Sequence, residues 1–124
     1  AYGIDVAAHK AALKFGLKTI AVFAHGLDSV YPSTHANTAA TIMHNGCVLT
    51  DYLSETESLK QNFPSRNRIV AGLSDATIVI ESAAKGGSLI TADIANSYNR
   101  EVFAVPGNPT ENNAKGCNYL IKSQ

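Results

Sequence analysis

The sequence contains no tryptophan, only two cysteines and few charged residues, which make up 16% of its 124 residues. Soluble proteins carry roughly 25% charged residues, so the helices and strands of this chain should be covered on several sides. The two cysteines, Cys47 and Cys117, are too few for a disulfide framework and favour a reducing, cytoplasmic location. No apolar run approaches the ~20 residues needed to cross a bilayer, which argues against a membrane-spanning helix.

The chain also lacks an excess of either charge, because 10 lysines and arginines balance 10 aspartates and glutamates. This balance argues against a basic tail or arm, so any anion-binding site must come from a local cluster. The four histidines and two cysteines show no metal-ligand spacing, and no serine lies in a G-x-S-x-G motif. Neither a metal site nor a catalytic residue is therefore predicted.

Short continuous apolar runs are the clearest structural signal that is present. They occupy residues 19–24, 47–50, 77–80 and 102–105, and about 25 to 30 residues separate their starts. Continuous runs of this length are typical of parallel strands covered on both faces, and the spacing leaves room for a crossover helix in each gap. The pattern predicts an α/β fold built from β-α units.

Helix ends can be placed from glycine, proline, serine and asparagine. Helices are predicted over residues 4–15, 33–45, 64–73 and 87–98, with Ser33 as an N-cap and with Gly16 and Asn99 in left-handed positions. The first of these helices begins at the start of the chain, where an α/β fold normally has a strand. We therefore expect a single domain, residues 1–124, truncated inside its first β-α loop.

The loop after the third run has the composition of a phosphate cradle. Lys85, Gly86, Gly87 and Ser88 lead directly into a predicted helix, whose free backbone amides attract an anion. Thr91 would add a hydroxyl at the same end. The loop matches neither the P-loop nor the G-x-G-x-x-G pattern. A tight strand-to-helix turn that needs glycine only for its geometry is the alternative interpretation.

A second cluster is locally basic in an otherwise neutral chain. Arg66 and Arg68 flank Asn67 near the predicted start of a short helix, where positive charge opposes the helix dipole. One arginine could reach a phosphate, or the pair could be structural and bound to carboxylates. Tyr31 and Phe63 could stack on bases, but packing in the core is the favoured interpretation for both.

Several sequence blocks together resemble the DNA-processing protein A (DprA/Smf) family. These blocks run in order along the chain: Gly3-Ile4-Asp5, Ala8-His9, Gly26-Leu27-Asp28, Tyr31-Pro32, Asn62-Phe63-Pro64, Arg66-Asn67-Arg68-Ile69, Gly72-Leu73-Ser74, Gly87-Ser88-Leu89-Ile90-Thr91-Ala92 and the segment 100–107. The resemblance covers essentially the whole chain. It implies a three-layer Rossmann-like fold, with a mainly parallel sheet flanked by helices.

The resemblance also implies a function. Members of this family bind single-stranded DNA, dimerise through this domain and load RecA-type recombinase in natural transformation and recombination; they are not known as enzymes and need no cofactor. The residues expected around DNA are Arg66, Asn67, Arg68, Lys85, Gly86, Gly87, Ser88, Thr91 and Gly26. Tyr2 stands where many members carry lysine or arginine.

Two other functions remain open from the residues alone. A phosphate cradle on a Rossmann-like fold could bind a small nucleotide or serve its hydrolysis, although that chemistry needs a carboxylate beside the glycine-rich loop. The crevice could instead be structural, in a domain that binds only other proteins. Binding of oligonucleotide, nucleotide or neither discriminates among the three.

Overall fold

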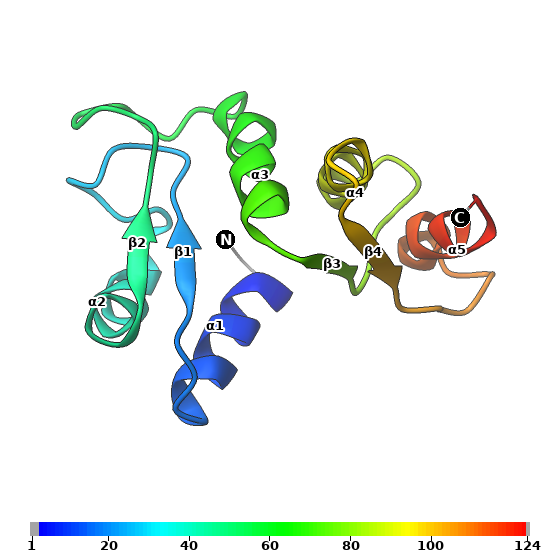
Figure 1. Ribbon diagram of the computed structural model, residues 1–124, viewed down its shortest axis with the longest axis horizontal. Helices are drawn as coiled ribbons and strands as arrows, with labels where there is room; N and C mark the ends of the chain where they lie inside the picture. The colour runs from blue at the N-terminus through cyan, green and yellow to red at the C-terminus, as the bar shows by residue number, and fades with distance from the viewer. Residues whose placement is uncertain (1–2, 124) are drawn as a thin grey trace. The chain divides into compact units, whose positions relative to one another are not determined.

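A computed structural model of the chain describes residues 3–123, so Tyr2 lies outside the described residues. The chain separates into two compact units, Ala1–Arg66 and Asn67–Gln124. Figure 1 labels the elements, in chain order α1 (Ile4–Lys14), β1 (Ile20–Val22), η1 (Ser33–His35), α2 (Ala36–Asn45), β2 (Cys47–Leu49), α3 (Asn62–Leu73), β3 (Ala76–Val79), α4 (Gly87–Ser97), β4 (Glu101–Ala104), η2 (Asn112–Ala114) and α5 (Lys115–Ser123).

The first unit is built on a parallel pair of strands. β1 pairs with β2 in a register that places Ala21 opposite Val48. α2 packs against both strands, and α1 packs against α2. Ala21, Ala39 and Ile42 are buried, which places the core of this unit between α2 and the strand pair. Small and β-branched side chains let the helix approach the strands closely.

The second unit repeats this plan with a second parallel pair. β3 pairs with β4, and α4 packs against both strands while α5 packs against β4. The core consists of Val79, Ala92, Cys117 and Leu120, with Leu89, Val102 and Ala104 packed against it. Cys117 is almost completely buried, so it acts as a small apolar residue rather than a reactive thiol.

The predicted α/β organisation is confirmed. Each predicted strand is present, although the first spans only Ile20–Val22. The predicted ends of α1 and α4 are confirmed as well, since Gly16 and Asn99 both have positive φ angles, of 72° and 57°. The regular alternation of strand and helix follows from the spacing of the apolar runs.

Three details differ from the predictions. α3 begins at Asn62, two residues before the predicted start, and Ser33 begins a 3-10 turn without making a side-chain cap. The helix Lys115–Ser123 was not predicted. Its buried Gly116, Cys117 and Leu120 recur at the three-to-four residue spacing of an amphipathic helix, which was the available signal.

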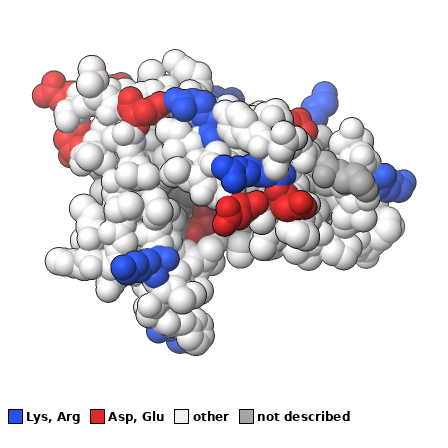
Figure 2. Space-filling model, in the orientation of Figure 1, with Lys and Arg blue, Asp and Glu red and all other residues white. Residues whose placement is uncertain are grey.

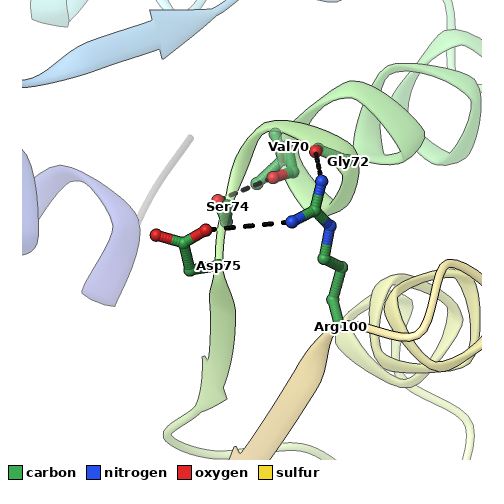
Figure 3. A network of polar contacts seen from close by, with 5 residues as sticks. All are labelled: Val70, Gly72, Ser74, Asp75 and Arg100. Atoms are coloured by element: carbon green, nitrogen blue, oxygen red, sulfur yellow. Dashed lines mark hydrogen bonds and ion pairs between the residues drawn. The ribbon is translucent and has the colours of Figure 1, made fainter.

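An arginine joins the start of β4 to the end of α3 (Figure 3). Arg100 donates from Nη2 to the Gly72 carbonyl oxygen at 3.3 Å, and its Nη1 lies 3.8 Å from Oδ1 of Asp75. The Ser74 hydroxyl donates to the Val70 carbonyl at 2.7 Å and closes the last turn of α3. Since the Asp75 side chain is fully exposed, solvent screens this ion pair and it adds little to stability.

No helix among residues 3–123 is long and apolar enough to span a membrane.

The imidazole of His9 makes the stability of the first unit sensitive to pH. Its Nδ1 lies 2.7 Å from Oγ1 of Thr19, which ties α1 to the segment before β1. Burial lowers the pKa of His9, and the nearby Asp5 carboxylate opposes that effect only in part. The folded chain therefore binds a proton at His9 less readily than the unfolded chain does.

We predict that the melting temperature falls as the pH drops below about 6.5, the ordinary pKa of histidine, because the unfolded state then takes up the proton first. His9→Gln should make the melting temperature less dependent on pH between pH 7 and pH 5. An identical pH dependence of melting in both proteins, followed by circular dichroism, would contradict this assignment.

Candidate functional site

Side chains from α3 hold the end of β1 in the first unit. Arg66 donates from Nη1 to the Val22 carbonyl oxygen at 2.6 Å, and Asn62 donates from Nδ2 to the Ala24 carbonyl oxygen at 3.1 Å. Asn62 is buried and Arg66 is half-buried. Buried backbone carbonyls need hydrogen-bond partners, and these two residues supply them where β1 passes into its loop.

The loop that follows β1 is packed tightly against the loop that follows β2. The Gly26 amide donates to the Thr56 carbonyl at 3.1 Å, and the Glu55 amide donates to Oδ1 of Asp28 at 2.8 Å. A Cβ at Gly26 would lie 2.6 Å from the carbonyl oxygen of Leu53. Gly26 is thus buried with its amide already engaged, and its predicted contact with DNA stays a prediction.

His25, in the loop after β1, is a structural residue. It is only 3% exposed, and its Nδ1 lies 2.7 Å from the Gly26 carbonyl oxygen. The His25 carbonyl accepts a hydrogen bond from the Thr50 hydroxyl at 2.7 Å, which links the two strand ends. These contacts hold the imidazole within the loop packing.

The Arg66 side chain is held by contacts within the first unit. Besides its bond to Val22, its guanidinium carbon lies 5.7 Å from the centre of the Phe63 ring. Burial lowers the pKa of Arg66, while the Asp5 carboxylate opposes this change. Because α3 begins at Asn62, Arg66 lies in the second turn of the helix rather than at its start. The predicted conflict with the helix dipole is therefore wrong for Arg66, since the dipole acts mainly in the first turn.

Arg68 and Asn67 lie farther along the same helix. Arg68 is exposed and Asn67 is half-buried. Residues two positions apart on an α-helix point about 200° away from each other around its axis. Arg66 and Arg68 therefore project from opposite sides of α3. This geometry disfavours contact of both arginines with the same phosphate.

The predicted phosphate cradle lies in the second unit, at the start of α4. Gly86 occupies the N-cap position, and no side chain caps the helix. The amides of Gly86 and Leu89 donate to backbone carbonyls, whereas those of Gly87 and Ser88 make no backbone hydrogen bond with the described residues. Lys85 is exposed directly before them. Two amides and one lysine at an uncapped helix start form an anion-binding arrangement.

Thr91, which was predicted to add a hydroxyl at the same helix start, lies in the second turn of α4. Its side chain is buried in α4, with 9% of its surface exposed, and its hydroxyl donates to the Gly87 carbonyl oxygen at 3.4 Å. This hydroxyl is turned along the helix toward the preceding turn, an arrangement common for threonine in helices. The predicted contact of Thr91 with DNA stays a prediction, and the structure gives the residue a packing role.

The cradle loop is held by the helix that sequence reasoning missed. The Gly116 amide, at the start of α5, donates to the Ser82 carbonyl at 2.8 Å, and the Ser82 amide donates to the Asn113 carbonyl at 3.0 Å. A Cβ at Gly116 would lie 2.5 Å from the carbonyl oxygen of Ala83. Gly116 is therefore needed for the close approach of α5 to the loop, and it is a residue the sequence interpretation did not select.

On the face drawn in Figure 2, most of the surface is uncharged, and lysine and arginine atoms occur in small separate groups. Among residues 3–123, no three histidine, cysteine or acidic side chains are grouped so that they could hold a metal ion. Phosphate binding here would depend on backbone amides together with single cationic side chains.

Comparison with known proteins identifies the family. The family model for DNA recombination-mediator protein A matches residues 1–124. The chain belongs to this family. It is 45% identical over 122 residues to the DNA processing protein DprA of Streptococcus pneumoniae and 44% identical over 121 residues to the protein Smf of Synechocystis, covering 98% of this chain in both cases. The predicted resemblance is confirmed.

Solved structures of family members share the fold. The structure of DNA processing protein A from S. pneumoniae matches 99% of this chain and 44% of its own length, with a TM-score of 0.90 and 43% identity. The Helicobacter pylori protein, whose structure was described for its mode of binding single-stranded DNA, matches 99% of this chain and 55% of its own length, with a TM-score of 0.89 and 32% identity. The predicted Rossmann-like α/β fold is thereby confirmed. The chain spans 43% and 30% of the S. pneumoniae and Synechocystis curated relatives.

Gly26 and Gly87 should respond differently to an added methyl group. Gly26→Ala places a Cβ against the backbone of Leu53 and Ser54 and should destabilise the chain by about 1–3 kcal/mol. At Gly87 a Cβ meets no atom within 4 Å, so Gly87→Ala should leave stability unchanged or slightly raised. Urea unfolding followed by circular dichroism measures both changes, and equal midpoints for the two variants would contradict the packing role of Gly26.

Proposed function

We propose that this chain binds single-stranded DNA, with the start of α4 and Lys85 as the phosphate-binding centre. The observation that carries the proposal is the uncapped start of α4, where the amides of Gly87 and Ser88 follow an exposed lysine, Lys85, closely along the chain. Family membership and the single-stranded DNA bound by the H. pylori relative support the same function.

The chemistry of the cradle suits a repeating phosphate backbone. Amides at a helix start donate hydrogen bonds to phosphate oxygens, and the helix dipole favours their negative charge. Gly87 has no Cβ that would keep a strand away from the backbone, and the hydroxyl of Ser88 is close by in sequence as a further donor. Phosphate contacts carry no sequence information, so binding should tolerate any base sequence.

The residues on and near α3 have different roles in this proposal. Arg68 and Asn67 supply polar and cationic groups on one part of the helix. Arg66 and Gly26 shape the loop after β1, because the guanidinium of Arg66 donates to Val22 and the amide of Gly26 donates to Thr56. Arg66 contributes its positive charge to the local field, and its bond to the backbone makes it a poor site for a clean binding test.

The wider role that we propose is mediation of recombination. The chain would act as a DNA-binding protein rather than an enzyme, in the cytoplasm, as a homodimer that loads a RecA-type recombinase onto single strands during natural transformation. The family description as a recombination mediator and the names of the relatives as DNA processing proteins support this role. Two copies would double the number of phosphate contacts and raise affinity through their linkage.

Lys85→Ala should weaken binding of a labelled oligothymidine and of a mixed-sequence strand by the same factor. It should also lower the slope of log affinity against log salt by about 0.7, the value for one lost phosphate contact on a single strand. Fluorescence anisotropy at several salt concentrations measures both quantities. Lys122→Ala removes the same charge from the far end of α5 and serves as the control. Equal slopes in the wild type and in Lys85→Ala would contradict the phosphate contact.

Gly87→Ala separates binding from folding. Because a Cβ at this position meets open space in the free chain, the variant should melt like the wild type. The same Cβ would stand between the helix start and a bound phosphate, so affinity for the oligonucleotide should fall several-fold. Unchanged affinity together with unchanged melting would remove the start of α4 from the proposed site.

A nucleoside monophosphate in the same titration tests the alternative ligand. If the strand binds through many phosphates and the monophosphate fails to displace it, the single-stranded DNA proposal holds. Saturable binding of the monophosphate with no binding of the oligonucleotide would instead favour a small-nucleotide site. Binding of neither would overturn both and leave a protein-interaction role.

A further inference from the structure

Three side chains of the first unit, Tyr31, Phe63 and Arg66, lie in a row that supports the solvent-exposed ring of Tyr31. The ring of Tyr31, in the loop after β1, lies 6.1 Å from the ring of Phe63 at the start of α3, with an angle of 56° between their planes. The guanidinium of Arg66 lies over the same Phe63 ring and donates to the Val22 carbonyl. The row thus connects Tyr31 through α3 to the backbone of β1.

Tyr31 is anchored but not covered. Pro32, the next residue, is buried, whereas 54% of the Tyr31 surface is exposed. The favoured interpretation from the sequence, that Tyr31 packs in the core, is therefore wrong. Single exposed apolar residues are common and need no special role. Tyr31 differs because a second ring and a buried proline already restrict its motion, so a ligand that stacks on it has less side-chain entropy to remove.

We propose that Tyr31 is a stacking surface for one base of a bound single strand. This inference rests on the proposed function and adds to the phosphate contacts a subsite that recognises the base face. Proteins that bind single strands combine cationic groups with aromatic rings, because every base has a face that can stack. Lys60, exposed just before α3, and Arg66 supply positive charge on the same unit as Tyr31.

The test compares two labelled strands of equal length, oligothymidine and an abasic strand with the same phosphates. Tyr31→Leu should weaken the binding of oligothymidine by about fivefold or more, the effect of losing one stacked base. It should leave the binding of the abasic strand unchanged. Tyr31→Phe keeps the ring and should bind both strands like the wild type.

Tyr119→Leu serves as the matched control, because Tyr119 is 63% exposed on α5 in the other unit. Its affinity for both strands should equal that of the wild type. Melting temperatures of all variants, measured by circular dichroism, verify that they are folded.

Each outcome decides between the two proposals. Equal losses on both strands in Tyr31→Leu, or no loss on either, would overturn the stacking role while leaving single-strand binding in place. A similar loss in Tyr119→Leu would also overturn it, because the effect would not depend on the position of the tyrosine. A wild-type chain that binds neither strand would overturn the proposed function itself.

Discussion

The hydrogen bond from the Arg66 guanidinium to the Val22 carbonyl, together with that from Asn62 to the Ala24 carbonyl, sets the geometry of the first unit. A carbonyl buried at the end of a strand loses its bonds to water and must find another donor. Two donors one turn apart on α3 meet this need. The position of α3, and with it the support beneath Tyr31, depends on these bonds.

In the loop before α4, backbone groups rather than side chains supply the hydrogen bonds to the main chain. Ser82 donates to Asn113 and accepts from the amide of Gly116, so the loop is held by main-chain bonds from η2 and α5. This arrangement requires glycine at 116, since a Cβ would meet the backbone of Ala83. No side chain caps the start of α4, so the amides of Gly87 and Ser88 stay available for an anion.

Local sequence predicted most elements because the signals act over short distances. Continuous apolar runs indicate strands, and a glycine or asparagine at the end of a helix favours the left-handed conformation. The different roles of Arg66 and Arg68 could not be predicted from such local signals. Arg66 and Arg68 look alike in sequence, yet one donates to a strand carbonyl in the folded chain and the other is exposed.

The sequence alone determined the α/β class, the order of the four strands and of helices α1 to α4, the family, and the glycine-rich start of α4. These properties depend on residue type and on spacing along the chain. Only the tertiary structure decided that Gly26 and Thr91 are packed, that Arg66 supports β1, and that Tyr31 is exposed. Each of these depends on which distant groups meet a side chain, and the pairing of donors with acceptors across the fold is set by packing rather than by neighbours in sequence.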